Sequence, residues 1–141
     1  MYSEDEGVWM RSRFEILEIE VLHSHEEIKP DILDCLADQI AKDGALFKPI
    51  VVDEKTYVIL DGHHRFEALK RLGCKRIPVF LVDYMDTAIE VVTWPGAVVN
   101  EISKDEIIAM GLSDNVYPPK TSRHIIRVIL EDRPVELPKL R

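Results

Sequence analysis

Residues 57–73 constrain the fold more than any other part of the sequence. The apolar run at 57–60 is typical of a strand, and Asp61 and Gly62 then lead directly into a helical pattern. Phe66 faces inward in this pattern, and Gly73 stands where a helix ends. A strand that passes through a glycine into a helix predicts a fold built from both kinds of element.

Other patterns predict the remaining elements. Residues 17–21 alternate between apolar and acidic side chains, which predicts a half-exposed strand that buries Leu17, Ile19 and Val21. The further predicted elements are a helix at 30–42 that ends at Gly44, a hairpin of 49–52 with 57–60, a buried strand at 77–82, a strand at 91–92, a helix that starts with the capping box of 103–106, and a β-branched stretch at 125–129.

Composition limits the classes of protein that fit. The 141 residues suit one domain, and 46% apolar with 31% charged residues is the balance of a globular chain. With 18 basic and 26 acidic side chains the net charge is −8, which argues against nucleic acid or an anionic membrane surface as a partner. Any phosphate must therefore be bound by a local site.

The cysteine spacing and the apolar segments of the sequence give an expectation for the cellular location. Cys35 and Cys74 show no zinc or disulfide spacing, and there is no signal peptide or membrane-spanning apolar stretch, so we expect a cytoplasmic protein. Only three amide side chains occur, Gln39, Asn100 and Asn115, a depletion that hints at a thermophilic source.

All five histidines stand at predicted element boundaries. His63 and His64 open the helix after Gly62, together with Arg65, where unpaired N–H groups and the positive end of the helix dipole attract anions. Three such donors in one helical turn are suited to phosphate oxygens. The alternative is that Asp61 caps the helix and the basic side chains are solvated.

Two further polar clusters are candidates for the same chemistry. Residues 119–124 combine two cations, two hydroxyls and His124, which suits phosphate, although a solvated basic loop has the same pattern. Residues 23–27 place His25 beside Glu26, or simply supply acidic residues to the start of a helix. A metal site made of the five histidines has no recognised ligand spacing to support it.

Residues 58–73 resemble the signature of the ParB/sulfiredoxin-like superfamily, and the doubled histidine resembles its archaeal free L-serine kinase branch. Three more stretches agree with that branch: His25 with Glu26, residues 82–84 with Thr93 and Trp94, and residues 117–124. The resemblance covers about residues 14–130 in the same order. Four short motifs in one order favour common descent over chance.

Three departures from the superfamily pattern narrow the function. His63 stands where sulfiredoxins have their catalytic cysteine, so the sulfinic-acid repair reaction lacks its nucleophile. Partition-type ParB proteins have Gly-Glu-Arg-Arg at positions 62–65 and continue into a helix-turn-helix domain, which this chain has no room for. Longer serine kinases carry a large insertion where this chain has only residues 95–116.

The resemblance implies a compact α+β domain, a small mixed sheet flanked by helices, that spans 1–141 as one catalytic domain with residues 1–13 as a flexible leader. It also implies transfer of a phosphoryl group from a purine nucleotide, ATP or ADP, to the hydroxyl of free L-serine. The alternative is a nucleotide-binding switch, or a DNA-associated adaptor or nuclease, without small-molecule kinase activity.

By the same resemblance each candidate residue has an expected role. Glu26 is the general base, with His25 beside it. Asp61 holds Mg²⁺, directly or through water, and Phe47, Trp94 and His124 shape the serine pocket. The expected phosphate-binding residues are Gly62, His63, His64, Arg65, Lys120, Thr121, Ser122, Arg123 and His124.

Overall fold

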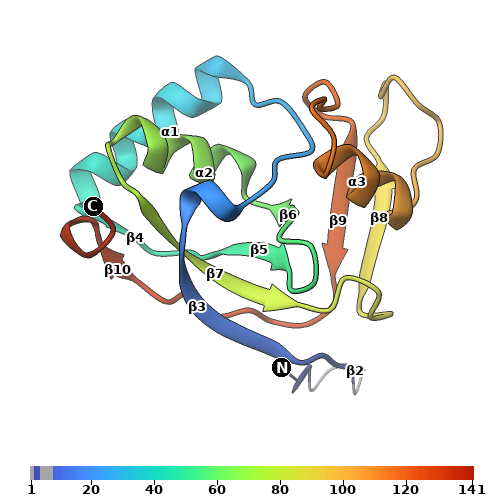
Figure 1. Ribbon diagram of the computed structural model, residues 1–141, viewed down its shortest axis with the longest axis horizontal. Helices are drawn as coiled ribbons and strands as arrows, with labels where there is room; N and C mark the ends of the chain where they lie inside the picture. The colour runs from blue at the N-terminus through green and yellow to red at the C-terminus, as the bar shows by residue number, and fades with distance from the viewer. Residues whose placement is uncertain (1, 4–7) are drawn as a thin grey trace.

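The computed structural model describes residues 2–3 and 8–141, with side chains from Met10 onward (Figure 1). Its strands are β1 (Tyr2–Ser3), β2 (Val8–Trp9), β3 (Ser12–Glu18), β4 (Ala45–Leu46), β5 (Ile50–Asp53), β6 (Ile59–Asp61), β7 (Arg76–Val82), β8 (Ile89–Thr93), β9 (Ser122–Ile126) and β10 (Val135–Glu136). Its α-helices are α1 (Pro30–Asp43), α2 (His63–Arg71) and α3 (Lys104–Gly111), with 3₁₀ turns at Ile19–Val21 and Leu137–Lys139.

A mixed four-stranded sheet in the order β3-β7-β5-β6 forms the centre of the fold. β7 lies antiparallel to β3 and parallel to β5, and β6 returns antiparallel to β5, as the predicted hairpin requires. Six of the seven residues of β7 are buried, which confirms the buried strand predicted at 77–82. The α+β class with a small mixed sheet is therefore confirmed.

The first strand lies earlier in the chain than its sequence pattern predicts. β3 pairs with β7 from Ser12 to Glu18, and the alternation at 17–21 continues into a 3₁₀ turn in which Val21 is exposed. The turn is fixed by the Ile19 N–H, which donates to the Lys75 carbonyl at 2.8 Å. Within the range 1–13 that was expected to be a flexible leader, Met10 is buried and Ser12 and Arg13 pair with β7, whereas residues 1 and 4–7 lie outside the described chain.

Helices α1 and α2 lie side by side over one face of the sheet (Figure 1). α1 has Pro30 at its first position and ends at Gly44, whose φ of +70° is the left-handed conformation that glycine adopts without strain. Leu33, Ala37 and Ile40 are its buried residues. Both helices occupy the positions in the sequence that their periodicity predicted.

A second apolar cluster, separate from the one under α1 and α2, includes Val51, Val82, Tyr84 and Ile107. It joins the sheet to α3 and to the antiparallel ribbon of β8 and β9, which stand together at one end of the molecule in Figure 1. α3 starts with the predicted capping box. In the part of the chain that the structure describes, no helix is long and apolar enough to cross a membrane.

Candidate active site

A cleft of about 420 Å³ lies where four separate segments of the chain meet. These segments are the loop before α1, the turn from β6 into α2, the end of β8, and the loop that enters β9. The residues that line the cleft are His25, Glu26, Glu27, Lys29, Leu36, Leu60, Asp61, Gly62, His63, His64, Arg65, Trp94, Pro119, Lys120, Ser122, Arg123 and His124. Lys29, Arg65, Lys120 and Arg123 bring four cations to one site in a chain of net charge −8.

The start of α2 forms one wall of the cleft. Its N-cap is Gly62, which no side chain caps, so the alternative in which Asp61 caps the helix is wrong. Gly62 has a φ of +108°, and a Cβ there would overlap the Ile50 side chain and come within 2.8 Å of the Arg65 guanidinium. Only glycine fits this position, and the uncapped helix start stays accessible to an anion.

The doubled histidine attaches the loop before α1 to α2. His63 Nε2 accepts the backbone N–H of His25 at 3.2 Å, and His64 Nε2 accepts that of Lys29 at 3.0 Å. Burial, followed by the neighbouring charges of His25 and His124, holds the pKa of His63 well below its ordinary value. Burial and then the Lys120 charge lower the pKa of His64. Both rings are thus neutral, and each Nε2 is an acceptor occupied by a backbone N–H, so neither Nε2 is the phosphate donor expected at the helix start.

Glu26 reaches across the cleft to the loop before β9. Its Oε1 accepts the Ser122 N–H at 2.8 Å and the Ser122 hydroxyl at 2.9 Å. Burial raises the pKa of the carboxyl, and the donors of Ser122, Thr121 and Lys120 oppose that rise. Both Ser122 donors are on Oε1, and the carboxylate lines the cleft, where it can accept a proton from a ligand.

The loop before β9 is held in an unusual backbone conformation. Lys120 has a φ of +61°, and the Thr121 hydroxyl donates to the Pro118 carbonyl at 2.7 Å. The charged ends of Lys120 and Arg123 lie over the ring of Trp94, at 4.6 and 5.1 Å from its centroid. Trp94 thereby fixes two of the four cations at the edge of the cleft.

Three histidine rings lie together at the base of the cleft. His25 contacts His63 and His124 edge to face, with centroids 4.5 and 5.8 Å away, and its Nε2 is 3.1 Å from the Ser122 hydroxyl. Burial lowers the pKa of His25 to about 4, although the backbone of Ile59 opposes the shift. Burial, then the charges of His25 and Lys104, lower the pKa of His124 to about 3. The cluster is neutral at physiological pH.

Asp61 is the candidate Mg²⁺ ligand. Its carboxylate is half-exposed and lies 3.5 Å from the Arg65 guanidinium, at the rim of the cleft. No group of three or more His, Cys, Asp and Glu side chains is arranged to hold a metal anywhere in residues 10–141. A lone carboxylate nevertheless fits Mg²⁺, which is usually held by one or two carboxylates together with the phosphates of a substrate.

Most of the predicted site residues meet in the cleft, and two do not. Phe47 is exposed and lies outside the lining, and the buried Thr121 uses its hydroxyl within its own turn. Lys29 also lines the cleft, although the sequence analysis does not include it among the site residues. A lysine directly before Pro30, the first residue of α1, is the sequence feature that could have indicated it. The sequence analysis also gives no role to Tyr84, whose hydroxyl lies 2.8 Å from His124 Nε2.

Residues 10–116 match the ParB N-terminal domain family, and the chain belongs to this family. Its most similar relatives include the ATP-dependent L-serine kinases of Staphylothermus marinus, 36% identical over 63% of this chain and 37% of the relative, and of Desulfurococcus mucosus, 31% identical over 83% and 49%. The chain therefore spans about half or less of the length of these curated relatives.

Solved structures give the same fold. A free serine kinase in complex with AMP superposes with a TM-score of 0.83 and covers 91% of this chain and 93% of its own. The two sequences are 17% identical, so this likeness establishes the arrangement of helices and strands and nothing finer.

Proposed function

We propose that this protein transfers the terminal phosphoryl group of ATP or ADP to the hydroxyl of free L-serine and forms O-phospho-L-serine. The observation that carries the proposal is the convergence of Glu26 with four cations and the uncapped start of α2 in one cleft. The names of the similar relatives, which are L-serine kinases, support the same substrates.

In the proposed reaction the protein mostly positions reactants and neutralises charge. The serine oxygen forms a bond to the terminal phosphorus, and the bond from that phosphorus to the bridging oxygen breaks. The hydroxyl proton passes to the carboxylate of Glu26, which lines the cleft. The nucleotide leaves with one phosphate fewer.

The phosphates are assigned to the cations around the cleft. Arg65 stands at the start of α2, while Lys120 and Arg123 approach from the opposite wall, so the two sides can hold one polyphosphate between them. Asp61, together with the phosphates, would hold Mg²⁺, which neutralises charge on the transferring group. We also propose that the residues that line this cleft act within one catalytic domain.

The test is direct. Purified protein is incubated with ATP or ADP, Mg²⁺ and L-serine, and the products are resolved by ³¹P NMR. We expect O-phosphoserine to appear in proportion to the nucleotide consumed. Nucleotide binding or hydrolysis with no phosphoserine, across a panel of free amino acids, would favour the nucleotide-binding switch and contradict the kinase.

A further inference from the structure

Tyr84 connects the apolar core to the cleft. It follows β7, its side chain is completely buried, and its hydroxyl lies 2.8 Å from Nε2 of His124 on β9, a strand of the separate β8–β9 ribbon. The two rings are tilted by 54° with centroids 5.4 Å apart. Tyr84 therefore contacts this residue of the cleft lining through both its hydroxyl and its ring.

The position of the proton in this bond follows from what surrounds it. Within residues 10–141, the Tyr84 hydroxyl forms no hydrogen bond other than the one to His124. A buried hydroxyl whose proton had no acceptor would lose free energy, so Tyr84 donates and Nε2 accepts. Burial, and then the charge of Asp53, raise the pKa of Tyr84, which keeps the phenol protonated.

The consequence for His124 is a fixed tautomer. Its ring is neutral, because burial and the charges of His25 and Lys104 lower its pKa to about 3. A neutral imidazole that accepts at Nε2 carries its proton on Nδ1. No described residue forms a hydrogen bond with Nδ1, and His124 lines the cleft. His124 thus has one N–H left with which to donate to a ligand.

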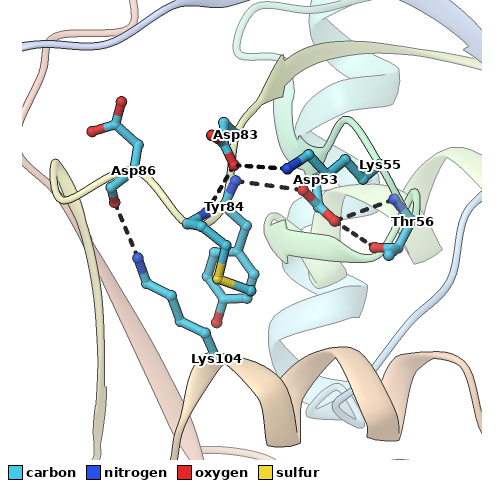
Figure 2. Close-up of polar contacts among 8 residues, drawn as sticks. Asp53, Lys55, Thr56, Asp83, Tyr84, Asp86 and Lys104 are labelled. Carbon is cyan, nitrogen blue, oxygen red and sulfur yellow. Dashed lines mark hydrogen bonds and ion pairs between the residues drawn. The ribbon is translucent and has the colours of Figure 1, made fainter.

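The rest of the structure holds Tyr84 firmly in place. The carboxylate of Asp53, which is 4% exposed, accepts the Tyr84 N–H at 3.4 Å and both the N–H and the hydroxyl of Thr56 (Figure 2). Figure 2 also shows Lys104 of α3, whose ammonium donates to the Asp86 carbonyl at 3.0 Å and lies 5.3 Å from the centroid of the Tyr84 ring. The backbone of Tyr84 is therefore anchored by Asp53, and its ring is anchored by Lys104.

We propose that Tyr84 is a positioning residue that holds His124 in the Nδ1–H tautomer, so that His124 offers the cleft a neutral hydrogen-bond donor for an anionic oxygen of the bound ligand. The role in catalysis rests on the proposed function, whereas the tautomer does not. The anionic oxygen belongs to the serine carboxylate or to a nucleotide phosphate. In either case His124 is a donor, and Glu26 remains the group that accepts the hydroxyl proton.

The variant that tests the proposal is Tyr84→Phe, which removes one oxygen and keeps the buried ring. Tyr57→Phe is the matched control, because the Tyr57 side chain packs against the other apolar cluster and its hydroxyl forms no hydrogen bond in the described chain. The first measurement is the ¹⁵N NMR spectrum of the histidine rings, with His124 assigned by comparison with His124→Asn. We expect the wild-type protein and Tyr57→Phe to show Nδ1–H, and Tyr84→Phe to show a mixture of tautomers.

The second measurement separates binding from chemistry. Because Tyr84 acts on one neutral hydrogen bond, Tyr84→Phe should raise KM for the ligand that His124 contacts about three- to tenfold while kcat changes less than about twofold. A higher KM for serine assigns the contact to its carboxylate, and a higher KM for nucleotide assigns it to a phosphate. Wild-type His124 with its proton on Nε2, or a Tyr84→Phe variant with unchanged tautomer and KM, would overturn the proposal. If neither the wild-type protein nor its variants formed phosphoserine, the kinase assignment would fail. The NMR spectrum would still decide whether Tyr84 fixes the tautomer of His124.

Discussion

Replacing Glu26 with glutamine separates the chemical role of this carboxylate from its structural one. The amide oxygen of glutamine can still accept the Ser122 N–H and hydroxyl, which lie 2.8 and 2.9 Å from Oε1. The loop before β9 and the nucleotide site should therefore keep their geometry. The variant loses only the ability to take a proton, so its effect should appear in kcat and leave nucleotide affinity nearly unchanged.

The expected size follows from general-base catalysis. Removal of a positioned base costs about 100- to 10,000-fold in rate, which corresponds to about 2.7–5.4 kcal/mol of activation free energy at about 1.36 kcal/mol per decade. Because burial raises the pKa of Glu26 above its ordinary 4.5, the wild-type kcat should decline on the acid side at a pH above 4.5. Glu26→Gln should lack that acid limb.

The contribution of Glu26 to the free energy of unfolding should depend on pH in the opposite direction to kcat, and should fall as pH rises. A raised pKa means that folded protein binds the Glu26 proton more tightly than unfolded chain, so the stabilisation from this group is present at low pH and is lost as pH rises through the folded pKa. At pH 7 the ionised carboxylate thus costs stability. Glutamine carries no charge and keeps the acceptor, and we expect Glu26→Gln to melt no lower than the wild-type protein at this pH.

The control for both measurements is Glu27→Gln. Glu27 also lines the cleft, but it is exposed and its side chain forms no hydrogen bond in the described chain, so this variant should keep kcat within about twofold. Steady-state kinetics and thermal denaturation at several pH values provide the data. An inactive Glu27→Gln beside an active Glu26→Gln would refute the assignment of the base.

Three further predictions concern the walls of the cleft. Gly62→Ala should lower the free energy of unfolding, measured by urea denaturation, by about 2–5 kcal/mol, because it combines a strained φ with overlap against Ile50 and Arg65. An unchanged urea midpoint would contradict the requirement for glycine at this position. Lys120→Ala should weaken nucleotide binding about 10- to 150-fold in calorimetric titration, with Lys48→Ala, outside the cleft, as the control. L-serine should have a higher kcat/KM than L-threonine, and faster transfer to a serine-containing peptide than to free serine would make the protein a protein kinase.

The features that sequence predicted well are set by neighbouring residues. α1 is marked by Pro30 at its start, Gly44 at its end and apolar residues at helical spacing between them, and α3 is marked by its capping box. The turn at Gly62 is equally local in one respect, since its φ of +108° alone favours glycine. Such signals are complete within one element, so periodicity and caps suffice to find them.

The features that sequence missed depend on partners far along the chain. His63 and His64 accept backbone N–H groups 38 and 35 residues away, so their neutral, acceptor role could not be predicted from a helix start. The family resemblance implies Phe47 in the serine pocket, but the preceding strand β4 pairs with β10, and the Phe47 ring is exposed outside the cleft. The alternation at 17–21 predicts a first strand that begins too far along the chain, because this pattern does not reveal that the pairing with β7 ends at Glu18.

The contact between Glu26 and Ser122 also bears on how the protein folds. It joins residues separated by 96 positions, so both walls of the cleft can meet only after the intervening chain has been organised. Closing such a long loop lowers the entropy of the chain before any hydrogen bond forms to offset that loss, so contacts of this kind slow folding. On a ribosome, the sheet strands β3, β5 and β7 and the helices α1 and α2 would leave the exit tunnel first. The cleft would form after these elements, as would the pairing of β10 with β4.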